Sequence, residues 1–214
     1  MIDIVNVWAF LLAAMLMIVA PGPGTFYVIG KAHQSPRLGS HATLGIVAGD
    51  VALITISGLG FASLMVRWPL ILLAVKVLGA IYLCYLGWDL MAGVQQQEPQ
   101  IALRENQPTD TRQSFLKGLL ITLVNPKAVL FFAAFFPLFI RIGATSTMHS
   151  FYVLGAIFEL LNLTYFVVVI LAVMRMRQRP IFDRFLKGGF DKLSGIALTG
   201  CGLLILVNEL FRHW

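Results

Sequence analysis

The sequence predicts an all-α membrane protein with six transmembrane helices, arranged as two inverted three-helix repeats in which helices 1 and 4 are broken by proline. Three observations predict this fold. The 214 residues are 58% hydrophobic and only 12% charged, which is more apolar surface than one soluble domain can bury. The apolar residues gather in stretches of about 20 residues or more, the length at which a helix crosses the hydrocarbon core. Polar interruptions recur in the same order in both halves of the chain.

Each of the six apolar stretches is expected to form one transmembrane helix. Lipid leaves backbone amides and carbonyls no partner outside their own segment, and the stretches lack the alternating pattern of barrel strands. The first is expected to be a mature helix rather than a signal peptide, because only Asp3 is charged before it and no small-residue cleavage motif follows. The expected helices cover Val7–Gly30, His41–Val66, Pro69–Ala92, Phe115–Ile140, His149–Met174 and Leu193–Leu210.

The repeat predicts how the chain is divided. Residues 1–93 and 114–214 are expected to form the two three-helix units of one integrated membrane domain, and the polar segment 94–113 has the composition of a cytoplasmic linker. An odd number of helices in each unit gives the second copy the opposite orientation. The motifs that recur are Ala20–Pro21 with Asn125–Pro126, Gly45–Asp50 with Gly155–Glu159, and Lys76–Gly79 with Lys192–Gly195.

The formal net charge of +6 comes from lysines and arginines that lie mostly in the loops. Anionic lipid head groups are a sufficient partner for these side chains, so binding to nucleic acid is not expected. Loops rich in lysine and arginine stay on the cytoplasmic side of a membrane. The first, third and fifth loops hold most of these residues, and both termini are therefore expected outside.

The cysteines and histidines are not spaced as in a redox or metal-binding site. Cys84 and Cys201 lie inside expected helices without a C-x-x-C pair, and the four histidines lie in loops or tails without ligand spacing. No catalytic triad or nucleotide-binding loop is evident either. We therefore expect no metal, no cofactor and no enzymatic activity.

Proline inside a spanning helix removes a backbone hydrogen bond and clashes with the preceding turn, so it destabilises the helix. A proline at such a position therefore indicates a functional or structural requirement for a break. The freed backbone groups need a partner, which can be substrate, ion, water or other protein, and the N-terminus of a half-helix favours an anion such as a carboxylate. A single proline can be an ordinary kink, but two at equivalent positions of a repeat favour function. Lys127, after the second break, can bind a carboxylate or cap a helix. The predicted binding residues are Pro21, Gly22, Pro23, Gly24, Asn125, Pro126 and Lys127.

Two carboxylates, Asp50 and Glu159, lie near the middle of the second and fifth expected helices. An ionised carboxylate at the bilayer centre costs about 2.5–3.5 kcal/mol on insertion scales, so both are expected to face the bundle interior. Such a group can carry a proton across, bind a substrate ammonium, or pair with a lysine or a backbone amide. Gly45 and Gly49 precede Asp50 and are expected to allow close helix packing that holds it beside the break at Pro21.

Several short motifs point to a known family: Pro21-Gly22-Pro23, Gly39, Gly45, Gly49-Asp50, Leu78-Gly79-Ala80, Tyr82-Leu83, Tyr85-Leu86-Gly87 and Asn125-Pro126-Lys127-Ala128. With these motifs the chain resembles the LysE-type amino acid exporter superfamily, in its homoserine/threonine resistance branch. The later segment Leu154–Tyr165 is most similar to the leucine exporters of that branch. The resemblance implies a dimeric protein of the bacterial inner membrane that exports small amino acids, leucine or other neutral ones, by proton antiport.

On this basis the two breaks are expected to bind the carboxylate and ammonium of an amino acid, while Asp50 and Glu159 couple its movement to protons. Two other classes of function stay open. An exporter of another small solute or ion, such as a basic amino acid or a metal cation, could use the same scaffold. A membrane enzyme or thiol relay would need reactive cysteines near the breaks, where Cys84 and Cys201 are not placed.

Overall fold

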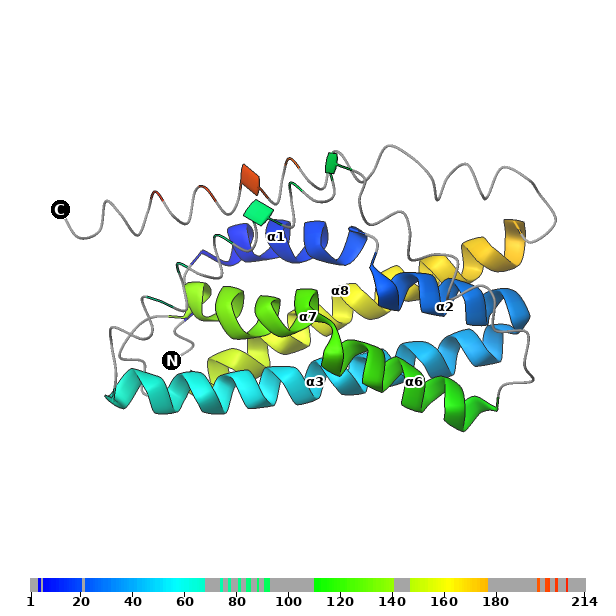
Figure 1. The fold of residues 1–214 in the computed structure, drawn as a ribbon, viewed down its shortest axis with the longest axis horizontal. Coiled ribbons are helices and arrows are strands. Elements are labelled where there is room, and N and C mark those ends of the chain that lie inside the picture. Colours follow the sequence, from blue (N-terminus) through cyan, green and yellow to red (C-terminus); the bar gives the residue numbers. More distant parts are fainter. Residues whose placement is uncertain are drawn as a thin grey trace.

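The computed structural model describes residues 4, 6–20, 22–67, 110–140 and 147–176, with isolated positions between 74 and 92 and between 196 and 207. Regular structure in these ranges is helical, with one isolated antiparallel bridge between Ile4 and Ile140. Figure 1 shows the helical segments lying side by side. They are α1 (Val7–Val19), α2 (Pro23–Gln34), α3 (Pro36–Arg67), α6 (Thr111–Val124), α7 (Pro126–Leu130), the π-helix η2 (Phe131–Phe135), the 3-10 helix η3 (Phe136–Phe139) and α8 (Thr147–Met176).

The described helices are long and apolar enough for a membrane. Pro36–Phe61 of α3 and Thr147–Arg175 of α8 can each cross as one helix, and two bent pairs of helices raise the number of candidate spans to four. The prediction of an all-helical membrane protein is therefore confirmed. The predicted spans at 69–92 and 193–210 lie outside the described residues apart from isolated helical positions. Six spans in two inverted repeats stay a prediction.

Two helices begin earlier in the chain than predicted. α3 begins at Pro36 rather than at His41, because proline suits the first position of a helix, where no amide is needed. α6 begins at Thr111, inside the segment predicted to be linker, because the Asp110 side chain accepts a hydrogen bond of 2.6 Å from the Thr111 amide. Local capping thus extends both helices into polar sequence.

The first and fourth predicted helices are both broken, as expected. α1 ends at Val19 and α2 begins at Pro23, with a bend of 54° between them. α6 ends at Val124, and the segment that begins at Pro126 is bent from it by 57°. Each proline takes the first position of the second half-helix, so it starts a helix rather than interrupting one. Pro21 lies outside the described residues.

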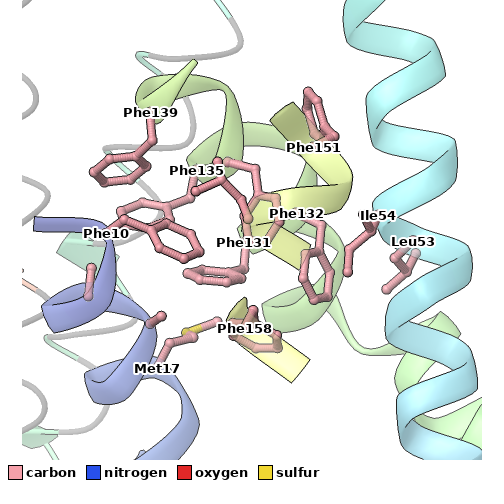
Figure 2. Packing of buried hydrophobic residues seen from close by; sticks show 14 of the residues in the cluster. Phe10, Met17, Leu53, Ile54, Phe131, Phe132, Phe135, Phe139, Phe151 and Phe158 are labelled. Atoms are coloured by element: carbon pink, nitrogen blue, oxygen red, sulfur yellow. The ribbon is translucent and has the colours of Figure 1, made fainter. Parts of the chain in front are cut away.

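Two hydrophobic clusters fill the bundle on either side of these breaks. The larger joins α1, α3, η2, η3 and α8, and phenylalanine rings dominate it (Figure 2). The ring of Phe10, for example, packs edge-on against Phe136 and Phe139, with both pairs of ring centroids 5.4 Å apart. The smaller cluster joins α2, α3 and α8 around residues such as Val28, Ile46 and Phe166. Residues of both clusters line the cavity that forms the candidate site.

Glycine allows α3 and α6 to lie in close contact. A Cβ atom at Gly45 would overlap the carbonyl of Phe115, and one at Gly49 would lie 2.7 Å from the Thr122 Cβ. From the other side, a Cβ at Gly118 would overlap the Ala42 carbonyl. The predicted close packing by Gly45 and Gly49 is confirmed, and its partner is α6. This contact fixes the part of α3 that carries the buried Asp50 against the helix that leads into the second break.

Gly45→Ala should therefore destabilise the protein. Overpacking costs about 1–3 kcal/mol, and here the overlap is with backbone that cannot rotate away, so we expect a lower melting temperature in detergent. Gly60→Ala is the matched control, because Gly60 lies on the same helix and, among the described residues, no atom comes within 4 Å of a Cβ built there. It should melt at or above the wild-type temperature. Equal melting of the Gly45 variant and the wild type would contradict this account of the contact.

Candidate substrate site

A cavity of about 80 Å³ lies where the two broken helices meet α3 and α8. It is partly open and has room for several water molecules. Its lining is polar in one part and apolar in the rest. The polar part is formed by Gly22, Gly24, Thr25, Asp50, Thr122, Asn125, Lys127 and Asn162, and the apolar part by Met17, Ile18, Ala20, Ile46, Ala128, Phe131, Phe132, Phe158 and Phe166.

Lys127 connects the two breaks. Its Nζ donates a hydrogen bond of 2.7 Å to the carbonyl of Ala20, which ends α1. A cation at the C-terminus of a helix is stabilised by the helix dipole. Nζ also lies 3.8 Å from the position that a Cβ would take at Gly22. Lys127 therefore caps a helix and lines the cavity, so the two roles considered from the sequence do not exclude each other.

The N-terminus of α2 opens onto the same cavity. Gly22 occupies the cap position of α2 in extended backbone and supplies no side-chain cap, and Pro23 has no amide to donate. Gly24 and Thr25, in the first turn, line the cavity. The positive end of the α2 dipole and the ammonium of Lys127 thus face one small space, a combination that favours an anion.

Asn125 has a structural role in addition to its place in the lining. Its Oδ1 accepts a hydrogen bond of 3.0 Å from the Lys127 amide, which caps the N-terminus of α7. This bond holds the backbone of Lys127 at the break. The second break therefore positions the lysine that reaches across to the first.

Asp50 lies buried on α3 and faces α8. One of its carboxylate oxygens accepts a hydrogen bond of 3.0 Å from the Asn162 side-chain amide. Glu159 lies beside Asp50 and Asn162, but neither of its buried side-chain oxygens makes a hydrogen bond within the part of the chain that the structure describes. The two carboxyl groups that were predicted to face the interior are thus neighbours. Asp50 lines the cavity, and Glu159 lies behind it.

The structure brings together most of the predicted site residues. Gly22, Gly24, Asn125, Lys127 and Asp50 line one cavity, and Glu159 adjoins it. Two predicted binding residues, Pro23 and Pro126, are not part of the lining. Both prolines set the start of a half-helix, so they act on the backbone that surrounds the cavity rather than on its contents.

Sequence reasoning missed Asn162, the two threonines and the phenylalanines of the lining. Asn162 carried a usable signal, because it is a polar amide in an apolar segment and follows Glu159 by one helical turn, which places both on one face. The phenylalanines carried none, since they are typical residues of a buried or lipid-facing helix. Cys84, which the thiol hypothesis would need near the breaks, does not line the cavity.

Broken helices that meet at a polar cavity inside an apolar bundle are the architecture of secondary transporters. The chain matches the family of LysE type translocators over residues 15–209, a range that contains both breaks, and it belongs to this family.

Several relatives support the assignment. An uncharacterized membrane protein of Pseudomonas aeruginosa is 34% identical over 212 residues, which are 98% of each chain. The leucine efflux protein of Enterobacter sp. (strain 638) is 32% identical over 164 residues, 76% of each chain, and that of Salmonella typhimurium is 31% identical over 170 residues, 79% of each chain. No solved structure gave a significant match.

Proposed function

We propose that this protein is a secondary transporter that exports small neutral amino acids, leucine among them, from the cytoplasm in exchange for protons. The observation that carries the proposal is the cavity between the breaks, in which a buried carboxylate, a lysine with an uncapped helix N-terminus, and an apolar wall lie within one small volume. These three features match the three parts of a neutral amino acid. The leucine efflux proteins among the relatives support leucine as a substrate.

The polar lining supports a specific orientation of the substrate. Its carboxylate would lie between Lys127 and the first turn of α2, where the ammonium and the helix dipole both favour negative charge. Its ammonium would lie at Asp50, and Asn162 holds that carboxylate in place. The side chain would then point to the apolar part of the lining.

The pair of carboxyl groups supports exchange for protons. Two buried carboxyl groups repel each other when both are charged, so the pair is suited to holding a proton. A substrate ammonium at Asp50 relieves the same repulsion. In the proposed mechanism the proton and the ammonium compete for Asp50, and Glu159 shares the proton without touching the substrate. Because Asp50 binds either the proton or the substrate ammonium but not both, the amino acid moves outward when the proton moves inward.

The distribution of basic residues supports the direction of transport and the location. α2 and α8 end, and α3 and α6 begin, at one end of the bundle (Figure 1). Lys31, Arg37, Arg112 and Arg175 lie within the terminal turns at that end. We propose that this end faces the cytoplasm of a bacterial inner membrane. The same proposal includes a homodimer in which each chain has six spans in two inverted repeats and both termini outside.

The export function is tested in cells loaded with a leucine-containing dipeptide. Cells that make the protein should release leucine several-fold faster than cells without it, and should tolerate higher concentrations of the dipeptide. Release is measured over minutes in the medium. Equal release from the two cell populations, with the protein present in the membrane, would contradict the proposed function.

A further inference from the structure

We infer that Phe131, Phe132 and Phe158 set an upper limit on the size of the substrate side chain, so that the transporter accepts aliphatic amino acids and rejects aromatic ones. The inference rests on the proposed amino acid site and adds the residues that select among substrates. These three rings form an aromatic wall within the apolar part of the cavity lining.

The three rings form one continuous surface. Phe131 and Phe132 come from η2 and Phe158 from α8 (Figure 2). The centroid of the Phe158 ring lies 5.2 Å from that of Phe131 and 5.2 Å from that of Phe132, which is the spacing of rings in contact. Phe158 precedes Asn162 by one helical turn, so α8 places the wall and the residue that holds Asp50 on the same face.

A second layer of rings packs behind the first. Phe131 stacks on Phe135 at 4.8 Å, and Phe132 packs edge-on against Phe136 at 5.0 Å. The π-helix contributes to this arrangement, because its wider turn brings side chains four residues apart closer to alignment. Such π-turns are rare and are frequently found at functional sites. Moving the wall aside would therefore break the packing between the two layers, and this cost opposes a larger side chain.

The space in front of the wall is small. The cavity has about 80 Å³ and is partly open, whereas an apolar cavity of about 150 Å³ binds one benzene molecule. A bound amino acid therefore extends into the opening, and only the end of its side chain meets the wall. The seven-carbon side chain of phenylalanine reaches farther than the four-carbon side chain of leucine, so it would have to displace a ring of the wall.

Phe132→Leu and Phe158→Leu test the inference. The introduced leucine side chain keeps most of the packing but is smaller than the phenylalanine ring, so the cavity becomes deeper at the wall. Free phenylalanine should then become a substrate. In proteoliposomes, the rate of phenylalanine transport divided by that of leucine should rise about tenfold or more in each variant. Phe151→Leu is the matched control. Phe151 is fully buried in the same cluster and on the same helix, but it does not line the cavity, so its ratio should equal that of the wild type.

The outcomes separate this inference from the proposed function. If the wall variants transport leucine but keep the wild-type ratio, or if Phe151→Leu changes the ratio equally, the inference is wrong and the export function stands. A wild-type protein that transports phenylalanine as fast as leucine also overturns it. A wild-type protein that transports no amino acid overturns both. If Phe132→Leu or Phe158→Leu fails to fold, Phe132→Met replaces it. This variant is expected to show the same rise in the rate of phenylalanine transport relative to leucine transport.

Discussion

Asp50→Asn should lower leucine transport in proteoliposomes by about 100-fold. Removing one partner of a buried charge pair costs about 2–5 kcal/mol, and here the lost carboxylate is the proposed partner of the substrate ammonium and of the transported proton. The amide can still accept the hydrogen bond from Asn162, so the helix contact and the fold should survive. Initial rates of radiolabelled leucine uptake, normalised to inserted protein, give the comparison.

Two further variants show whether the effect is specific to the site. Asp110→Asn removes a carboxylate at an exposed helix start and keeps the cap, so transport should not change. Glu159→Gln should retain exchange of leucine for leucine but lose the dependence on a pH gradient, because Glu159 adjoins Asp50 without lining the cavity. A wild-type rate in Asp50→Asn would contradict the proposed role of Asp50.

Lys127→Met should weaken leucine binding by about 10- to 100-fold. The loss of a charge-assisted hydrogen bond accounts for about 1.5–3 kcal/mol, and the N-terminus of α2 retains the rest of the affinity for a carboxylate. The variant also loses the bond to the Ala20 carbonyl, so a lower melting temperature is expected as well. Binding is measured as the concentration of leucine that protects the purified protein from thermal unfolding.

A substrate analogue separates the two effects of this substitution. Leucinamide lacks the carboxylate, so the wild type should bind it much more weakly than leucine. In Lys127→Met this preference for leucine should be at least about 10-fold smaller, because only the N-terminus of α2 still favours the carboxylate. If Lys127 only caps α1, the melting temperature falls but the preference for leucine over leucinamide is unchanged. That result would remove Lys127 from the binding site.

The breaks were predictable because their causes are local. Proline and glycine restrict or release the backbone where they occur, so the bends at residues 20–22 and at Asn125 could be located from the sequence. The same local rules explain the error in the starts of α3 and α6. Pro36 and Asp110 begin helices in polar sequence, which a search for apolar stretches does not include.

The content of the cavity was only partly predictable, because it depends on contacts between distant helices. Asp50 and Glu159 stood out, since a charge in an apolar segment is costly wherever it lies. Asn162 on α8 meets Asp50 on α3, and Lys127 reaches the end of α1. These contacts depend on how helices distant in the sequence pack against one another, and no local rule specifies which side chains then meet.

The central claim is that leucine and protons cross in opposite directions through one site. The direct measurement uses proteoliposomes that hold leucine and a pH-sensitive dye, diluted into leucine-free buffer of equal pH. The account predicts that outward flow of leucine acidifies the lumen with the wild type, and that Glu159→Gln abolishes the acidification. Leucine efflux without any change in luminal pH, or no leucine efflux at all, would contradict it.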